Sequence, residues 1–168
     1  MNNEDALERF VETVGTVTAQ VVHIANVEQL NAKLHNLLGD TATVYCPGDT
    51  ELEQAVVIAP ERQEQDYIKA DACVEEVFGA IAETGSLICS SKEGKTVQAG
   101  LLPSHHVAIV STRNIYPTLN SFLDTCELSN MPTNITLETG PSRTADIELT
   151  LTVGVHGPER LSIVVVSN

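Results

Sequence analysis

The feature that most constrains the fold is an apolar run that does not alternate with polar residues, HHVAIVS at 105–111. A strand with one face in water alternates apolar and polar side chains. A near-continuous apolar strand is typical of a sheet that is covered on both faces. A second run, RLSIVVVS at 160–167, predicts another strand near the end of the sequence. These runs indicate buried strands inside a layered α/β domain.

The first sixty residues predict helices and strands in alternation. Residues 4–13 have apolar positions at helical spacing, and 16–25 are rich in β-branched residues, as in a strand. Residues 26–39 predict a helix that Asn26 caps and Gly39 ends. Short strands are expected at 42–47 and 54–60, each closed by a proline. Strand, helix and strand in this order predict a mostly parallel sheet flanked by helices.

The second half of the chain has a different order of predicted elements. FGAIA at 78–82 and SLIC at 86–89 lie on either side of Glu83, Thr84 and Gly85, which predicts a hairpin or sharp bend. A helix is expected over 114–127 and a strand over 134–140. No linker or repeat interrupts the pattern, so one domain is expected over residues 1–168.

Composition excludes several classes of function. The 168 residues carry a net charge of −14, which disfavours nucleic acid and anionic membranes as partners. The acidic N-terminal segment is unlike a signal peptide, and no apolar run reaches the ~18 residues of a membrane span. A cytoplasmic protein is expected. The four cysteines form no C-x-x-C pair, so we expect reduced thiols, no intrinsic iron–sulfur cluster and no metal site. The sequence also has no G-x-G-x-x-G fingerprint, so no other intrinsic cofactor is expected.

The stretch from 138 to 161 combines four glycine or proline turn signals with arginines and a histidine. It predicts a loop at Gly140–Ser142 beyond the carboxyl end of a strand, then a helix over 144–151 capped by Ser142 or Thr144. Arg143 beside the free N–H groups of a helix start would bind a phosphate or carboxylate. The alternative is purely structural: Ser142 and Asp146 cap the helix, and Arg143 pairs with an acidic neighbour.

Four motifs in chain order, AIAETGSLI, LLPSHHVAIV, GPSRTADIE and GVHGPERLSIVVV, resemble the LUD-domain family of lactate-utilisation proteins, of the LutC (YkgG) type. The resemblance implies a NagB/RpiA/CoA-transferase-like fold. It also implies a subunit or accessory protein of a complex that oxidises L-lactate to pyruvate. Iron–sulfur clusters would then belong to LutA-like and LutB-like partners only, and this chain would bind a small anion.

The resemblance also implies the site residues. Glu83 and His156 are the candidate catalytic residues, as nucleophile and as proton donor. The candidate ligand-binding residues are Thr84, Gly85, His105, Gly140, Ser142, Arg143, Thr144, Asp146 and Gly157. A structural role is the alternative for both catalytic candidates, with Glu83 accepting backbone N–H groups and His156 holding its loop. Neighbouring strand residues point to opposite faces, so His105 and His106 are not expected to share a metal ion.

Two other functions remain open from the sequence. The chain could be a stand-alone acyl- or CoA-transferring enzyme that uses Glu83, or a module that senses a metabolite without catalysis. The oligomeric state is also open, a homodimer included. For every function that uses the motifs, Glu83, Arg143 and His156 are expected to face one cavity at the carboxyl edge of the sheet.

Overall fold

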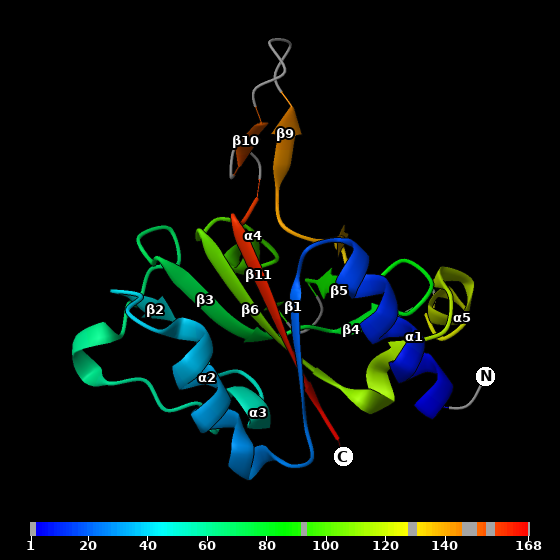
Figure 1. Cartoon of the computed structure of the whole chain (residues 1–168), viewed down its shortest axis with the longest axis horizontal. Helices are drawn as coiled ribbons and strands as arrows, with labels where there is room; N and C mark the ends of the chain where they lie inside the picture. Colours follow the sequence, from blue (N-terminus) through cyan, green and yellow to red (C-terminus); the bar gives the residue numbers. More distant parts are fainter. Residues whose placement is uncertain (1–2, 92–93, 128–130, 146–150, 154–156, 168) are drawn as a thin grey trace.

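A five-stranded parallel sheet forms one layer of the molecule (Figure 1). The computed structural model describes residues 3–91, 94–127, 131–145, 151–153 and 157–167. The strand order is β1-β11-β6-β3-β2, and every neighbouring pair is parallel. The bounds are β1 Gln20–Ile24, β2 Val44–Tyr45, β3 Ala72–Glu76, β6 His105–Ser111 and β11 Arg160–Val166. The two apolar runs lie at the centre of this sheet, so the predicted α/β class with a mostly parallel sheet is confirmed.

A second sheet of four strands continues from the first. Its order is β7-β4-β5-β8, with β4 Gly79–Ile81, β5 Ser86–Ser90, β7 Ile115–Tyr116 and β8 Ile135–Glu138. Strands β4 and β5 form the expected antiparallel hairpin, and β8 adds to β5, also antiparallel. Because β3 leads into β4 and β6 into β7 within a few residues, the second sheet begins at the carboxyl edge of the first.

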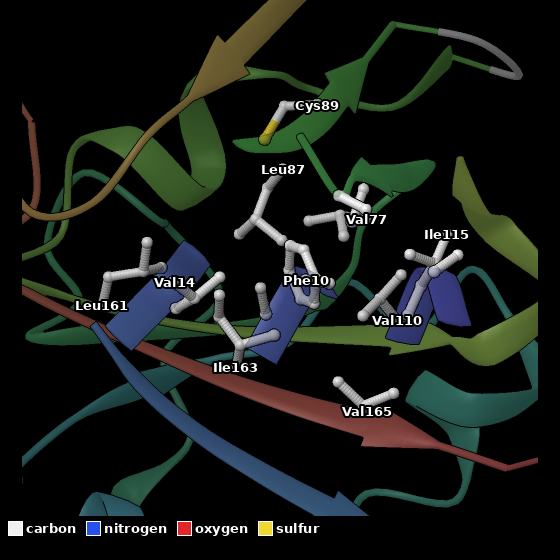
Figure 2. Close-up of a cluster of buried hydrophobic side chains, with 14 residues drawn as sticks. Phe10, Val14, Val77, Leu87, Cys89, Val110, Ile115, Leu161, Ile163 and Val165 are labelled. Carbon is white, nitrogen blue, oxygen red and sulfur yellow. The ribbon is translucent and has the colours of Figure 1, made fainter. Parts of the chain in front are cut away.

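Helices cover both faces of the parallel sheet. Helix α1 (Asn3–Thr16) packs between the two sheets, where Phe10 and Val14 contact Leu87 from β5 and Ile163 from β11 (Figure 2). On the opposite face lie α2 (Leu30–Leu38), which follows the 3₁₀ turn η1 (Val27–Gln29), and the short α3 (Glu51–Gln54). This double cover explains why β6 and β11 are apolar on both sides.

The remaining elements are short. They are the 3₁₀ turns η2 (Pro60–Arg62) and η4 (Thr112–Asn114), the helices α4 (Gln98–Leu101) and α5 (Leu119–Leu123), and the strands β9 (Arg143–Ala145) and β10 (Leu151–Val153). A third apolar cluster, centred on Ile81, Ile88 and Phe122, fixes α5 against the second sheet. Within the described part of the chain, no helix has the length and apolar character needed to cross a membrane.

Three expected elements differ from those observed. The strand expected at 54–60 does not form, because a capping box between Thr50 and Glu53 begins α3 and draws Gln54 into it. The helix expected over 114–127 is limited to Leu119–Leu123. Its first residues, Ile115 and Tyr116, pair with β4 instead, and a second capping box at Thr118 starts the helix.

The third difference concerns the turn-rich stretch. Where a helix was expected over 144–151, β9 and β10 pair in antiparallel register, with Thr144 opposite Thr152. The helix prediction is therefore wrong for 144–145 and 151, and residues 146–150 lie outside the described residues. β-branched side chains favour the extended backbone on both arms. In Figure 1 this hairpin projects from the end of the molecule where β11 begins, which is the amino edge of the parallel sheet.

Candidate functional site

A cavity of about 230 Å³ opens where β3 leaves the parallel sheet and enters the second sheet. It is lined by Thr50, Glu76, Val77, Phe78, Ser90, Lys95, Asn114 and Tyr116. These residues come from the start of α3, the end of β3 and its link to β4, the end of β5, the segment between β5 and α4 that holds Lys95, and the stretch from η4 to β7. The carboxyl edge of a parallel sheet is where α/β proteins usually bind ligands, and this cavity occupies that position.

Lys95 is held in a fixed position at the cavity wall. Its Nζ donates to Glu53 Oε1 at 2.9 Å and to the carbonyl oxygen of Glu76 at 2.8 Å. The Glu53 side chain is fully buried, and it also accepts the backbone N–H groups of Asp49 and Glu76 at 2.8 Å each. An ammonium has three N–H donors. Within the described residues two of them are taken, which leaves one for a group in the cavity.

A smaller pocket of about 10 Å³ extends from the cavity toward the interior. The two spaces share five lining residues, and the smaller one adds Glu75, Cys89, Thr96 and Val97. A volume of this size holds about one water molecule. The side pocket therefore lies next to the cavity and is lined in part by Glu75, which is 5% exposed.

Behind Glu75 lies a triad of buried charged residues, Glu75–His106–Glu138. His106 Nδ1 is 2.7 Å from Glu138 Oε2, and His106 Nε2 is 3.3 Å from Glu75 Oε1, an ion-pair distance without hydrogen-bond alignment. The His106 side chain is inaccessible to solvent, and burial alone would lower its pKa. The two carboxylates outweigh that effect and raise the pKa of His106 to about 10. His106 is therefore an imidazolium at neutral pH.

His105 has the opposite environment on the other face of β6. Its Nε2 lies 2.9 Å from Ser162 Oγ, and burial, with Arg160 and His106 nearby, lowers its pKa to about 4. His105 is thus a neutral imidazole at pH 7. The expectation that the two histidines point to opposite faces is confirmed by their different partners. A ligand-binding role for His105 stays a prediction.

Two Glu-Thr-Gly turns lie side by side at the end of α1, one at 83–85 and one at 138–140. Ser86 Oγ is 2.7 Å from Thr84 Oγ1 and 2.5 Å from Thr139 Oγ1, so hydroxyl groups link the turns. Gly85 and Gly140 have φ of +67° and +78°, which favours glycine, and both approach the backbone of α1 or of Val17 just beyond it. Thr84, Gly85 and Gly140 are therefore brought together, as parts of a turn pair.

The side chain of Glu83 contacts the start of α5. Its Oε1 accepts the backbone N–H of Leu119 at 2.8 Å, at the first residue of α5. This contact corresponds to the structural alternative, in which the carboxylate of Glu83 satisfies a free N–H group. The catalytic role of Glu83 stays a prediction, and Glu83 is not among the residues that line the cavity.

The loop that carries Ser142 lies at the amino edge of the parallel sheet. Ser142 N–H donates to the carbonyl oxygen of Pro158 at 2.8 Å, two residues before β11, and a Cβ on Gly157 would lie 3.3 Å from Ser142 Cβ. The expected position at the carboxyl edge is therefore wrong. The reason is that β8, which leads into this loop, belongs to the second sheet and runs antiparallel to β5.

The remaining predicted residues lie in or next to the hairpin. The backbones of Arg143 and Thr144 are in β9. Asp146 and His156 lie outside the described residues, as does the side chain of Arg143. A shared cavity for Glu83, Arg143 and His156 stays a prediction, but the cavity at the carboxyl edge has other walls.

Sequence reasoning missed Lys95 and the triad. A signal for Glu75 was present, because Glu75 and Glu76 are two adjacent carboxylates among the apolar residues of ACVEEV at 72–77. Glu138 follows the apolar positions of β8, and His106 belongs to the apolar run of β6. Strands β3 and β6 pair in the parallel sheet, whereas β8 pairs with β5 in the second sheet. Only the arrangement of the two sheets brings the three residues together, and no local pattern reveals it.

Comparisons with known proteins agree with the fold. The LUD domain family model matches residues 59–166. Lactate utilization protein C of Macrococcus caseolyticus is 39% identical over 95 residues, which are 52% of this chain and 40% of that protein. Protein YkgG of Escherichia coli is 27% identical over 184 residues, covering 98% of this chain and 79% of that protein.

The crystal structure of a DUF162 family protein from Deinococcus radiodurans superposes with a TM-score of 0.73. It covers 99% of each chain at 19% identity, a likeness that concerns the fold alone. The chain spans less than half the length of the Macrococcus protein and of lactate utilization protein C from Exiguobacterium.

Proposed function

Because the chain belongs to the LUD-domain family, we propose that it works in lactate utilisation as a LutC-type component. In this role it binds a small α-hydroxy or α-keto carboxylate in the cavity beside Lys95. The names of its relatives support the pathway, and the position and lining of the cavity support the ligand class.

The observation that carries the proposal is the fixed ammonium of Lys95 at the wall of a small cavity that both polar and apolar residues line. A ligand carboxylate accepts its remaining N–H group, and the polar side chains of Asn114 and Tyr116 are available to a hydroxyl or keto oxygen. Lys95 is already ordered by Glu53 and Glu76, so little side-chain entropy is lost when the ligand binds. The cavity is below the usual range of about 300–1,000 Å³ for larger ligands, which favours a small one.

Membership of this family suggests that this chain and its partner proteins have different roles in lactate oxidation. Electrons would pass to iron–sulfur clusters on LutA-like and LutB-like partners, while this chain binds the carboxylate. The thiols support this assignment, because a cluster is bound by thiolates. Burial raises the pKa of Cys73 and Cys89 well above the usual range and that of Cys46 to about 11.

The proposal is tested in the native host. Deleting the gene should stop growth on L-lactate as sole carbon source and leave growth on glucose unchanged, and the wild-type gene should restore growth. Purified protein should bind L-lactate or pyruvate in calorimetric titrations. Normal growth of the deletion strain on lactate would disprove the pathway role.

A matched pair of variants tests the cavity. Tyr116→Phe removes one hydroxyl at the cavity wall and keeps the ring, so we expect several-fold weaker binding of L-lactate. Tyr67→Phe, at a tyrosine that packs on Tyr45 outside the cavity, should bind like the wild type. Equal affinities of all three proteins would place the ligand elsewhere.

A further inference from the structure

The buried triad Glu75–His106–Glu138 has hydrogen-bonding atoms that its own contacts do not satisfy. Among the described residues, His106 Nε2 and Glu138 Oε1 are buried atoms without an aligned hydrogen-bond partner. Buried polar atoms are usually satisfied, and exceptions often mark a functional group. One imidazolium between two carboxylates also leaves one net negative charge in the interior, which a single added proton would neutralise.

The surroundings of the triad supply little other charge. The thiols of Cys73 on β3 and Cys89 on β5 face it, and burial raises their pKa well above the usual range, so both are neutral. Lys95 is near enough to Cys89 to affect its thiol, but its ammonium is paired with Glu53. Among the described residues, these neighbours therefore do not neutralise the net negative charge of the triad.

Helix α4 covers the triad without contributing a side chain at its centre. A Cβ on Gly100 would lie 2.6 Å from His106 Cε1 and also overlap Glu75 Oε1. Only glycine lets the helix backbone lie this close. The side pocket, which Glu75 lines, shares five lining residues with the cavity and has room for about one water molecule.

We propose that Glu75 is the acid–base residue of the cavity, acting through a water in the side pocket, and that His106 and Glu138 are positioning residues that hold its charge and its proton. The inference rests on the proposed function in one respect, that a small carboxylate enters the cavity. When that anion binds, one proton moves from solvent to the triad, and the net charge of the site is unchanged. The same proton is then available to the ligand.

Proton-linked calorimetry tests this coupling. L-lactate is titrated into the full chain at one pH in buffers of different ionisation enthalpy, and the slope gives the protons taken up per ligand. We expect a slope of about one half to one proton for the wild type and near zero for Glu75→Gln. Glu61→Gln, at an exposed surface glutamate, is the matched control and should keep the wild-type slope. A full slope in Glu75→Gln would overturn the inference.

A ligand-free measurement separates this inference from the proposed function. The carboxyl carbon of Glu75 and the ring nitrogens of His106 are followed by NMR in the wild type between about pH 5 and pH 11, a range that includes the pKa of His106 at about 10. An acid–base residue coupled to His106 responds when His106 loses its proton, so both signals should shift in one shared transition. If the Glu75 signal stays constant while the protein remains folded, Glu75 is only a structural counter-ion.

The NMR measurement on the wild type also tests the inference if Glu75→Gln does not fold or if L-lactate does not bind. A shared transition without lactate binding would support the triad as an acid–base centre and contradict the ligand class of the proposed function. Glu138→Gln gives a further readout, because loss of the closer carboxylate should move the transition toward lower pH.

Discussion

At the scale of single residues, His105 and His106 show how neighbours in one strand acquire opposite charge states. His106 faces two carboxylates and has its pKa raised to about 10, while His105 faces Ser162 and has its pKa lowered to about 4. Each shift links folding to pH, with opposite signs. Together they predict a stability maximum near neutral pH, with a different histidine limiting each side.

Above neutral pH, the change of folding stability with pH depends on His106. The folded state binds the proton more tightly than the unfolded chain, whose histidine titrates near 6.5. The stabilisation is therefore complete below pH 6.5 and is lost as the pH rises through 10. We expect the free energy of unfolding to fall between pH 7 and pH 10 in urea titrations. His106→Gln should lower it by about 3 kcal/mol at pH 7 and flatten this decline. His23→Gln, at an exposed histidine, should change neither.

The acid side depends in part on His105. Its folded pKa is lowered, so its stabilisation is present above pH 6.5 and is lost as the pH falls through 4. His105→Gln retains an amide that can bond Ser162 and removes the titrating ring. We expect the loss of stability between pH 6.5 and pH 4 to become shallower in urea titrations of this variant. If His105→Gln loses stability between pH 6.5 and pH 4 as steeply as the wild type does, the carboxylates alone cause that loss.

At the scale of elements, short capping contacts decide where helices begin. Glu83 accepts the first N–H of α5, while Thr118 and Ser121 form the capping box. We expect Glu83→Ala to lower the free energy of unfolding by about 1 kcal/mol and Glu83→Gln, which keeps an acceptor oxygen, by less. Both variants should sustain growth on L-lactate. Failure of the well-folded Glu83→Gln variant to grow would instead support a catalytic carboxylate.

The paired Glu-Thr-Gly turns predict a second effect at this scale. Gly140 has φ of +78°, and an added Cβ would lie 2.7 Å from the Val17 carbonyl oxygen. Gly48 has a similar φ of +75° but no atom within 4 Å of such a Cβ. Gly140→Ala should therefore destabilise the protein by about 1–3 kcal/mol, and clearly more than Gly48→Ala, in thermal unfolding. Equal effects would show that backbone strain alone is responsible.

At the scale of the whole molecule, the sequence predicted what local patterns determine. The apolar runs of β6 and β11 identified buried parallel strands, and the turn at 83–85 identified a hairpin. The placement of β8 was not predictable, because its pairing with β5 connects residues about fifty positions apart. Once β8 joins the second sheet, the Ser142 loop falls at the amino edge, and Glu138 comes to His106. The triad depends on this distant pairing, because Glu138 is the last residue of β8.

The position of β11 between β1 and β6 has a consequence for biosynthesis. Strand β1 is synthesised about 140 residues before its partner in the sheet, Arg160–Val166. Until then β1 has no strand to pair with, and the apolar edge of β6 is open. Such long-range pairing slows folding and exposes unpaired edges. The nascent chain should therefore depend on chaperones until translation passes residue 166.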